Sequence, residues 1–281
     1  MSDLLEKEKR AIKLLRTVSQ ATDGDIELSY SGGKDSDVCL ALAQMAGIPY
    51  RAIYKNTTID PPGTIAHCKE KGAEIIRPKK SFFEIIEQKG FPSRFTRFCC
   101  SELKEYKILD TAIQGVRSSE SPKRAANYKE PIMCRTYGSK ANHVNVVLPI
   151  LDWADEDVRR FVVSNGIKCH PLYYDESGQF CVNRRLGCLG CPLKSQKKRV
   201  AEFVKYPKML KLWVVNHQKY LDSHPNSKSF SFCKGKAYNG MFQELFTSNN
   251  ERYELLITGG MFPETAIDAK QFLDDYFKIE L

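Results

Sequence analysis

Apolar positions in the first third of the chain form short strand-like runs that alternate with longer helical stretches. A run at 26–30 leads directly into the glycine pair at 32–33, and the stretch that follows is nearly all apolar until Gly47. This order predicts a strand, a tight turn and a buried helix that ends at a glycine. Residues 50–54 alternate like a second strand, and a third strand is predicted from Ala73.

The next two helices are indicated by the residues at their ends. The prolines at 61–62 open a short helix that ends near Gly72. Ser81 and Glu84 have the spacing of a capping box, so we expect a further helix to about Lys89. The alternation of strands and helices predicts a parallel sheet covered by helices.

The pattern after residue 100 predicts two helices with a strand between them. A helix is expected over 101–113, a strand over 145–150, and another helix that begins with the acid-rich segment 153–157. From about Lys194 onward the pattern is helical. We therefore predict an α/β protein in which a parallel sheet flanked by helices occupies 1–192 and a mainly helical C-terminal subdomain occupies 193–281.

The composition is that of a globular protein without a membrane segment. The 281 residues are 42% hydrophobic and 27% charged. No run approaches the roughly 18 apolar residues that cross a bilayer, and the charged N-terminal segment is unlike a secretory signal, so we expect a cytoplasmic protein with no membrane partner. The net charge of +9 attracts anionic partners, but it fits a nucleotide enzyme and a nucleic-acid binder equally well.

The strongest motif in the chain is the SGGKDS loop that follows the first predicted strand. It consists of Ser31, Gly32, Gly33, Lys34, Asp35 and Ser36. The glycines let the backbone approach a ligand, the amides at the start of the next helix favour an anion, and Lys34 adds a positive charge. The spacing of a Walker loop is missing. The loop instead resembles that of the adenine nucleotide alpha-hydrolase (PP-loop) superfamily, which implies an adenine nucleotide and chemistry at its α-phosphate.

Four of the ten cysteines form two tight pairs. One pair is Cys99 with Cys100, and the other is Cys188 with Cys191. In a reducing cytosol such a set indicates metal binding, and four thiolates complete the ligands of either a zinc ion or a 4Fe-4S cluster. Adjacent cysteines favour the cluster, because it offers each sulfur a separate iron atom. Zinc and ordinary reduced thiols stay open as alternatives.

The order of motifs around these cysteines resembles the cluster-bearing reductases of the phosphoadenosine phosphosulfate (PAPS) reductase family, which act on adenylyl sulfates. The matching segments are RFCC at 97–100 followed by Lys104, GxRxxES at 115–121, PxxxW and DV from Pro149, and the CxxC pair, and they span about 29–192. The resemblance implies a 4Fe-4S cluster on the four cysteines. It also implies ATP or an adenylyl sulfate (APS or PAPS) as the nucleotide.

The same resemblance implies roles for single residues of the loop and of the GxRxxES segment. Arg117 is the best candidate for stabilising charge that develops in the transition state, and Lys34 would share that task. Asp35 would hold the loop or assist Mg²⁺. A plain cap at the start of the helix is an equal alternative for Asp35.

The C-terminal part departs from the family reductases. Those enzymes attack the sulfate sulfur with a cysteine in an ECGxH-like segment near the C-terminus, and the only cysteine beyond residue 191 here is Cys233, in FCKG. In this respect the chain resembles the DNA phosphorothioation sulfurtransferases, which keep the loop and the cluster without that cysteine. The basic segment 194–211 is typical of a surface that contacts a phosphate backbone, although a solvated helix face is the commoner reason for such a run.

Three functions follow from these patterns. The first is an ATP-using, cluster-bearing sulfur-transfer or adenylylating enzyme, with a sulfur donor such as a cysteine desulfurase and a nucleic-acid substrate as partners. The second is an adenylyl-sulfate or phosphoadenylyl-sulfate reductase that uses Cys233 as its nucleophile. The third is a non-catalytic redox sensor that binds a nucleotide.

Overall fold

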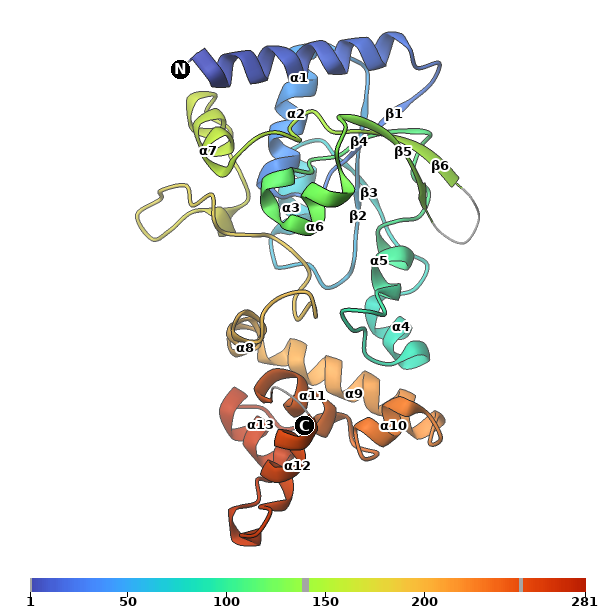
Figure 1. Cartoon of the computed structure of the whole chain (residues 1–281), viewed down its shortest axis with the longest axis vertical. Helices are drawn as coiled ribbons and strands as arrows, with labels where there is room; N and C mark the ends of the chain where they lie inside the picture. Colours follow the sequence, from blue (N-terminus) through green and yellow to red (C-terminus); the bar gives the residue numbers. More distant parts are fainter. Residues whose placement is uncertain (1, 138–141, 248–249) are drawn as a thin grey trace. The chain divides into compact units, whose positions relative to one another are not determined.

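The computed structural model forms two compact units, each built from two separate stretches of the chain (Figure 1). The described residues are 2–137, 142–247 and 250–281. Unit 1 consists of Met1–Pro78 and Cys100–Gly187, and unit 2 consists of Lys79–Cys99 and Cys188–Leu281. The domain division expected at residue 192 stays a prediction.

Unit 1 contains a six-stranded sheet with the strand order β3-β2-β1-β4-β6-β5. The strands are β1 Ile26–Ser29, β2 Arg51–Lys55, β3 Glu74–Ile76, β4 Thr111–Ile113, β5 Ile132–Tyr137 and β6 Asn142–Val147. Neighbouring strands from β3 to β6 are parallel, and β5 pairs antiparallel with β6 at one edge. The predicted α/β fold with a parallel sheet is confirmed, and the antiparallel edge strand was not predicted.

Several helices of unit 1 accompany this sheet. They are α1 Ser2–Gln20, α2 Lys34–Ala46, α3 Thr64–Glu70, α6 Pro122–Asn127 and α7 Asp155–Ser164, with 3-10 turns η1 Ser118–Glu120 and η2 Pro171–Tyr173. The main core joins Ile26 and Leu28 of β1 to Leu42 of α2 and Phe161 of α7. Figure 1 shows α1, α2 and α7 together beside the sheet, and α2 contacts both other helices.

The helix predicted over 101–113 is wrong. The short helix α5, Phe98–Leu103, ends early, and Thr111–Ile113 is strand β4 in the middle of the sheet. All three residues of β4 are buried between β1 and β6. A run of only three residues fits the helical and the extended period alike, so only the tertiary pairing selects the strand.

Unit 2 is helical in its described residues. Its helices are α4 Phe82–Lys89, α8 Gln196–Lys205, α9 Pro207–Ser223, α10 Lys228–Phe232, α11 Ala237–Phe246, α12 Asn250–Thr258 and α13 Ala269–Phe277, with a 3-10 turn η3 Pro263–Thr265. The predicted capping box of Ser81 and Glu84 is confirmed at the start of α4. Phe82 of α4 packs against Trp213 of α9 with ring centroids 4.8 Å apart, which joins the two stretches of the unit.

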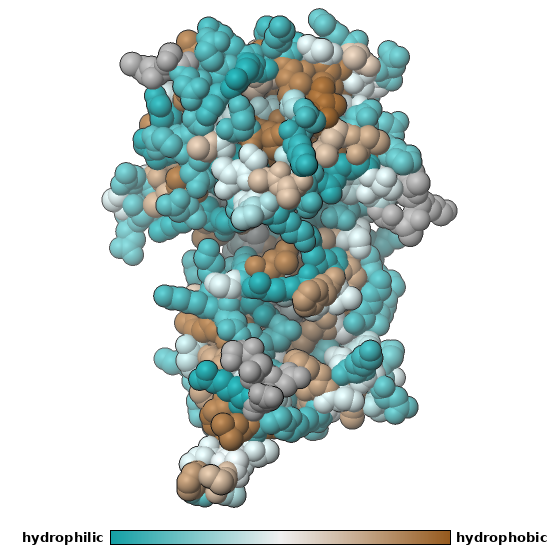
Figure 2. Space-filling view, viewed as in Figure 1, coloured by the Kyte–Doolittle hydropathy of each residue, from teal (hydrophilic) through white to brown (hydrophobic). Residues whose placement is uncertain are grey.

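Large hydrophobic side chains are exposed at several places, among them Phe95, Leu255 and Met261. The face on view in Figure 2 is mainly hydrophilic, with separate hydrophobic groups between the polar residues. Among the described residues, no helix has the length and apolar composition that crossing a bilayer requires.

Candidate functional site

The SGGKDS loop connects β1 to α2 and leaves the start of α2 open. Gly32 has φ of 72°, a left-handed conformation that favours glycine, and a Cβ there would lie 3.2 Å from Cys68 Sγ. Gly33 is the N-cap residue of α2, and no side chain caps the helix there. Uncapped amides at a helix start favour an anion, as the sequence predicted for this loop.

Two serines fix the path of the loop. Ser36 Oγ donates a hydrogen bond to the carbonyl oxygen of Gly33 at 2.7 Å and accepts one from the amide of Ser31 at 3.3 Å. The amide of Gly33 donates to Ser31 Oγ at 3.3 Å. The loop is therefore preorganised by its own side chains, and its shape does not depend on a bound ligand.

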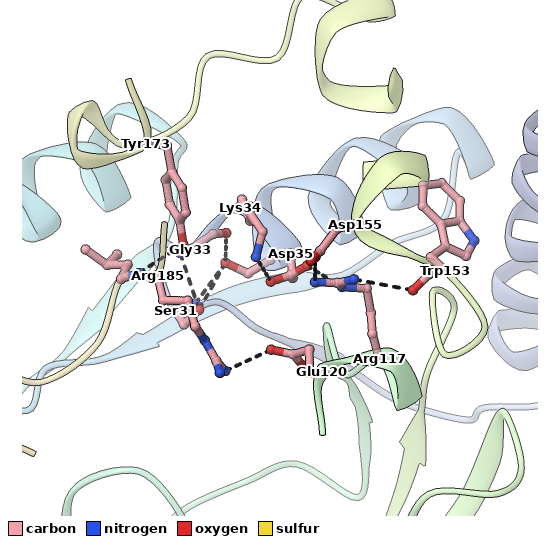
Figure 3. A network of polar contacts seen from close by, with 12 residues as sticks. Ser31, Gly33, Lys34, Asp35, Arg117, Glu120, Trp153, Asp155, Tyr173 and Arg185 are labelled. Carbon is pink, nitrogen blue, oxygen red and sulfur yellow. Dashed lines mark hydrogen bonds and ion pairs between the residues drawn. The ribbon is translucent and has the colours of Figure 1, made fainter. Parts of the chain in front are cut away.

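Asp35 joins the two predicted cationic residues (Figure 3). Lys34 Nζ donates to Asp35 Oδ2 at 2.9 Å, and Arg117 Nε donates to Asp35 Oδ1 at 2.8 Å. Lys34 is 3% exposed and Arg117 is 1% exposed. The structure thus brings together three of the predicted residues, from the loop and from the GxRxxES segment, in one buried network.

The rest of the Arg117 guanidinium is also engaged. Nη2 donates to Asp155 at 2.7 Å, and Nη1 donates to Ser119 Oγ at 3.1 Å and to the carbonyl oxygen of Trp153 at 3.3 Å. Burial lowers the pKa of Arg117, and the carboxylates of Asp35 and Asp155 raise it by a larger amount. The pKa of Arg117 therefore lies above the ordinary value. Arg117 holds Asp35 in this structure, and its predicted role in stabilising transition-state charge stays a prediction.

Gly115 allows the GxRxxES segment to lie directly against the loop. A Cβ at this position would lie 2.8 Å from the carbonyl oxygen of Asp35 and 3.2 Å from the amide of Ser36. Both neighbours are backbone atoms at the start of α2, which cannot move aside as a flexible side chain can. The glycine of this motif is therefore a packing requirement of the site.

A second ion-pair cluster beside the loop was not predicted. Arg185 Nη2 donates to Glu120 Oε1 at 2.9 Å, and Arg124 pairs with the other oxygen of Glu120. The next residue, Leu186, donates its amide to Tyr173 Oη at 3.1 Å. A Cβ on Gly33 would lie 3.3 Å from that same oxygen. Figure 3 shows Arg185 reaching past Ser31 to Glu120.

A cluster of buried polar side chains lies beside α2. Tyr30 Oη donates to Asp37 Oδ1, and His67 Nε2 lies 3.1 Å from both of these atoms. Burial and the charge of Asp37 raise the pKa of Tyr30 above its ordinary value. The cluster connects β1, α2 and α3. The aspartate that directly follows SGGKDS was the only signal of it in the sequence.

Three of the four predicted cluster cysteines belong to unit 2, which begins its second stretch at Cys188. Within this unit, Arg94 donates to the carbonyl oxygen of Pro192 at 3.1 Å, so the segment before Cys99 lies against the segment that carries Cys191. All four cysteines are half-buried. The donor set has the chemistry that a cluster requires.

No assembled metal centre is present in the part of the chain that the structure describes: it contains no group of three or more His, Cys, Asp or Glu side chains placed to hold a metal ion. Cys188 and Cys191 are joined through the backbone, since the amide of Cys191 donates to the carbonyl oxygen of Cys188 at 3.4 Å. The assignment of Cys99, Cys100, Cys188 and Cys191 as metal ligands therefore stays a prediction.

Cys233 has the opposite properties to those of a nucleophile. It is 0% exposed, and burial raises the pKa of its thiol to about 11. Its Sγ lies 3.7 Å from His217 Nε2, but burial lowers the pKa of His217 to about 4, so this imidazole is neutral and does not stabilise a thiolate. Burial and the raised pKa of its thiol argue against Cys233 as the residue that attacks a sulfonucleotide, and this alternative stays a prediction.

Comparisons with known proteins agree with the motifs. Residues 25–194 match the phosphoadenosine phosphosulfate reductase domain. The chain is 30% identical over 232 residues to an uncharacterized protein of Methanocaldococcus jannaschii, covering 75% of this chain and 53% of that protein. It is 27% identical over 207 residues to sulfate adenylyltransferase subunit 2 of Shewanella pealeana, covering 62% of this chain and 68% of that subunit.

Two further findings bear on the extent of these similarities. The chain spans about half the length of the first curated relatives it matches. Among solved structures, U34-tRNA thiolase NcsA from Methanococcus maripaludis, with its 4Fe-4S cluster, has a TM-score of 0.44 and 16% identity, covering 81% of this chain and 82% of that one.

Proposed function

Because the chain belongs to the phosphoadenosine phosphosulfate reductase domain family, we propose that it is an enzyme that binds ATP or an adenylyl sulfate on the SGGKDS loop and acts at the α-phosphate. The observation that carries this proposal is the uncapped start of α2 beside the ion pair of the buried Lys34 with Asp35. Its N-terminal amides and the lysine offer positive charge to a phosphate. The similarity to sulfate adenylyltransferase subunit 2 supports adenylyl chemistry.

The reaction that we propose is adenylyl transfer followed by sulfur transfer. An acceptor oxygen attacks the α-phosphorus of ATP, the bond to the β-phosphate oxygen breaks, and pyrophosphate leaves. A sulfide-level donor then displaces the activated oxygen, and AMP leaves with it. Lys34 and the α2 amides would stabilise the negative charge that moves onto the phosphate oxygens.

Asp35 would act by orienting the two cations. Each of its oxygens already accepts a hydrogen bond, one from Lys34 and one from Arg117. A carboxylate used in this way is poorly placed to hold Mg²⁺ as well, so we propose that Mg²⁺ enters with the phosphates of the nucleotide. Of the roles that the sequence left open for Asp35, we therefore propose that it holds the loop and does not bind Mg²⁺ directly.

The four cysteines at 99, 100, 188 and 191 would hold a 4Fe-4S cluster, which supplies sulfur or electron chemistry when bound. Their half-burial and the contact of Arg94 with Pro192 support this assignment. Lys194 Nζ also donates to the carbonyl oxygen of Cys188 at 2.8 Å, which fixes the CxxC turn from its C-terminal side. Zinc is the competing metal, and visible absorption distinguishes a zinc ion from a 4Fe-4S cluster.

The test is nucleotide turnover by anaerobically purified protein. With ATP, Mg²⁺ and candidate acceptors, we expect release of pyrophosphate, and Lys34→Met should lower it about 100-fold. Lys13→Met, at an exposed lysine of α1, is the matched control and should retain the wild-type rate. Absence of both nucleotide binding and turnover in the wild-type protein would contradict the proposal.

Two other outcomes identify the competing functions. Sulfite release from an adenylyl sulfate with a thiol reductant would indicate a reductase, and its loss in Cys233→Ser would identify Cys233 as the nucleophile. Nucleotide binding without turnover, together with a reversible change of cluster colour, would indicate the redox sensor. A cysteine desulfurase as donor, a nucleic acid as substrate and a cytoplasmic location stay predictions.

A further inference from the structure

Exposed positions of α8 and α9 in unit 2 carry lysines that no carboxylate neutralises. On α8, the side chains of Arg199 and Phe203 are buried, and the opposite face is exposed. On α9, the buried side includes Leu210 and Trp213. The exposed positions of both helices form what we call the lysine stripe, which consists of Lys197, Lys198, Lys205, Lys208 and Lys211.

The neighbouring basic residues are paired, in contrast to the stripe. Arg199 Nη1 lies 2.7 Å from Glu244, Lys219 Nζ lies 2.6 Å from Glu87, and Lys194 pairs with Glu202. Within the described residues, none of the five stripe lysines forms an ion pair with a carboxylate. The basic residues that stabilise the unit and the basic residues that face solvent are therefore two separate sets.

The charge of the chain is concentrated in the same unit. Unit 2 contains 19 Lys and Arg residues against 12 Asp and Glu, whereas unit 1 contains 24 against 22. Between residues 194 and 219 the only acidic residue is Glu202, and it is already paired with Lys194. The stripe is thus a set of exposed positive charges with a single acidic residue in the same segment, in contrast to the alternating signs of an ordinary solvated helix.

We propose that the lysine stripe binds the phosphate backbone of a nucleic acid. A rise of about 1.5 Å per residue separates Lys197 from Lys205 by roughly 12 Å along α8, so the charges follow an extended partner and are not gathered around one ion. A regular polyanion matches such a surface, because every phosphate can meet a lysine in turn. The inference goes beyond the proposed function, since it concerns unit 2 alone and requires no nucleotide.

The apolar side chains between the lysines fit the same partner. Val204 is 54% exposed and Leu212 is 44% exposed, and both lie on the exposed side of their helices. Such side chains pack against sugars and unstacked bases while the lysines contact phosphates. An acidic protein is the competing partner, and its carboxylates would have to match the positions of the stripe lysines.

The experiment measures binding of the full chain to fluorescent single-stranded and duplex DNA and RNA of about 25 nucleotides by anisotropy. One variant replaces all five stripe lysines with Gln. Its matched control replaces five other exposed lysines that form no ion pair in the described residues, so that net charge falls equally: Lys13, Lys123, Lys129, Lys228 and Lys236.

We expect the stripe variant to lose at least about 10-fold in affinity and the slope of log K against log salt to fall by roughly 3 to 4. The control should change affinity less than about 2-fold. Equal losses in both variants, absence of binding by the wild-type chain near 150 mM salt, or equally good competition by polyglutamate would each overturn the inference. Unchanged thermal melting of both variants excludes misfolding as the cause.

Discussion

At the scale of single residues, the cations beside the SGGKDS loop differ in how far they are free to meet a ligand. Lys34 and Arg117 are buried and held by Asp35, whereas the side chain of Arg185 is 56% exposed and held by Glu120. A buried cation that is paired with a carboxylate reorients only at a large free-energy cost. An exposed one can exchange its partner for a phosphate at little cost.

This difference gives a prediction for the pair of Arg185 and Glu120. We expect Arg185→Ala to weaken ATP binding about 10-fold and Arg185→Lys to restore part of it, because the arginine would leave Glu120 for a phosphate. Glu120→Gln should tighten ATP binding, because it removes the competing charge. Isothermal titration with MgATP measures both effects.

The two substitutions Arg185→Ala and Glu120→Gln are expected to change the affinity for ATP in opposite directions, and this difference is the decisive result. A purely structural ion pair would make both substitutions weaken binding, and that result would contradict the prediction. Arg159→Ala is a suitable control, because Arg159 also forms an exposed arginine–glutamate pair, with Glu156 at 2.6 Å on α7. It should leave the dissociation constant unchanged.

Gly115 gives a second prediction at the residue scale. Gly115→Ala should lower the free energy of unfolding by about 1–3 kcal/mol, because its Cβ would press on the backbone at Asp35. It should also weaken ATP binding, since the start of α2 must shift. Urea unfolding and titration with MgATP measure the two effects.

Gly72→Ala is the control for the Gly115 variant. Gly72 has φ of 74° with nothing within 4 Å of an added Cβ, so this change costs only backbone strain, about 1 kcal/mol. It should leave ATP binding unchanged. A Gly115 variant with wild-type affinity for ATP would show that the contact with the loop does not shape the site.

At the scale of elements, α9 buries a histidine that its neighbours leave neutral. His217 is 0% exposed, stacks on Phe91 with ring centroids 3.7 Å apart, and contacts Ser229 and Cys233 through Nε2. Burial lowers the pKa of His217 from 6.5 to about 4. In the folded protein this imidazole therefore binds a proton less readily than it does in the unfolded chain.

The sign of the resulting pH dependence follows from this shift. Between pH 6.5 and about 4 the unfolded chain binds the extra proton, so the stability of unit 2 falls as the pH falls. From pH 7 to pH 5 we expect a loss of about 2 kcal/mol from this group. His170 in unit 1 has its pKa lowered by burial and acts in the same direction.

Urea unfolding at pH 7 and pH 5 tests this prediction. The variant His217→Phe keeps an aromatic ring against Phe91 and cannot titrate, so the pH difference should shrink by that amount. His224→Asn, at an exposed histidine of the same region, is the control and should keep the wild-type pH dependence. An unchanged pH difference in His217→Phe would show that this imidazole does not cause it.

At the scale of the whole molecule, the parts that could be predicted from sequence were those encoded by neighbouring residues. The SGGKDS loop and the capping box of α4 are local motifs, and each is present where the sequence placed it. Strand β4 and the pairing of Arg185 with Glu120 depend on partners far along the chain. Local periodicity and spacing do not encode such partners, so these features became visible only in the fold.

The four cysteines combine both kinds of information, and they give the last prediction. Their local pairs are evident in the sequence, but a common centre requires segments about 90 residues apart to meet, as Arg94 and Pro192 do in unit 2. We expect brown anaerobic protein with broad absorption near 400 nm and about four irons per chain. Cys191→Ser should lower iron content several-fold, whereas Cys134→Ser, at an exposed cysteine of β5, should not. Colourless wild-type protein with one zinc ion would mean that the same thiolates hold a single tetrahedral metal, and the enzyme would then need a sulfur source other than a cluster.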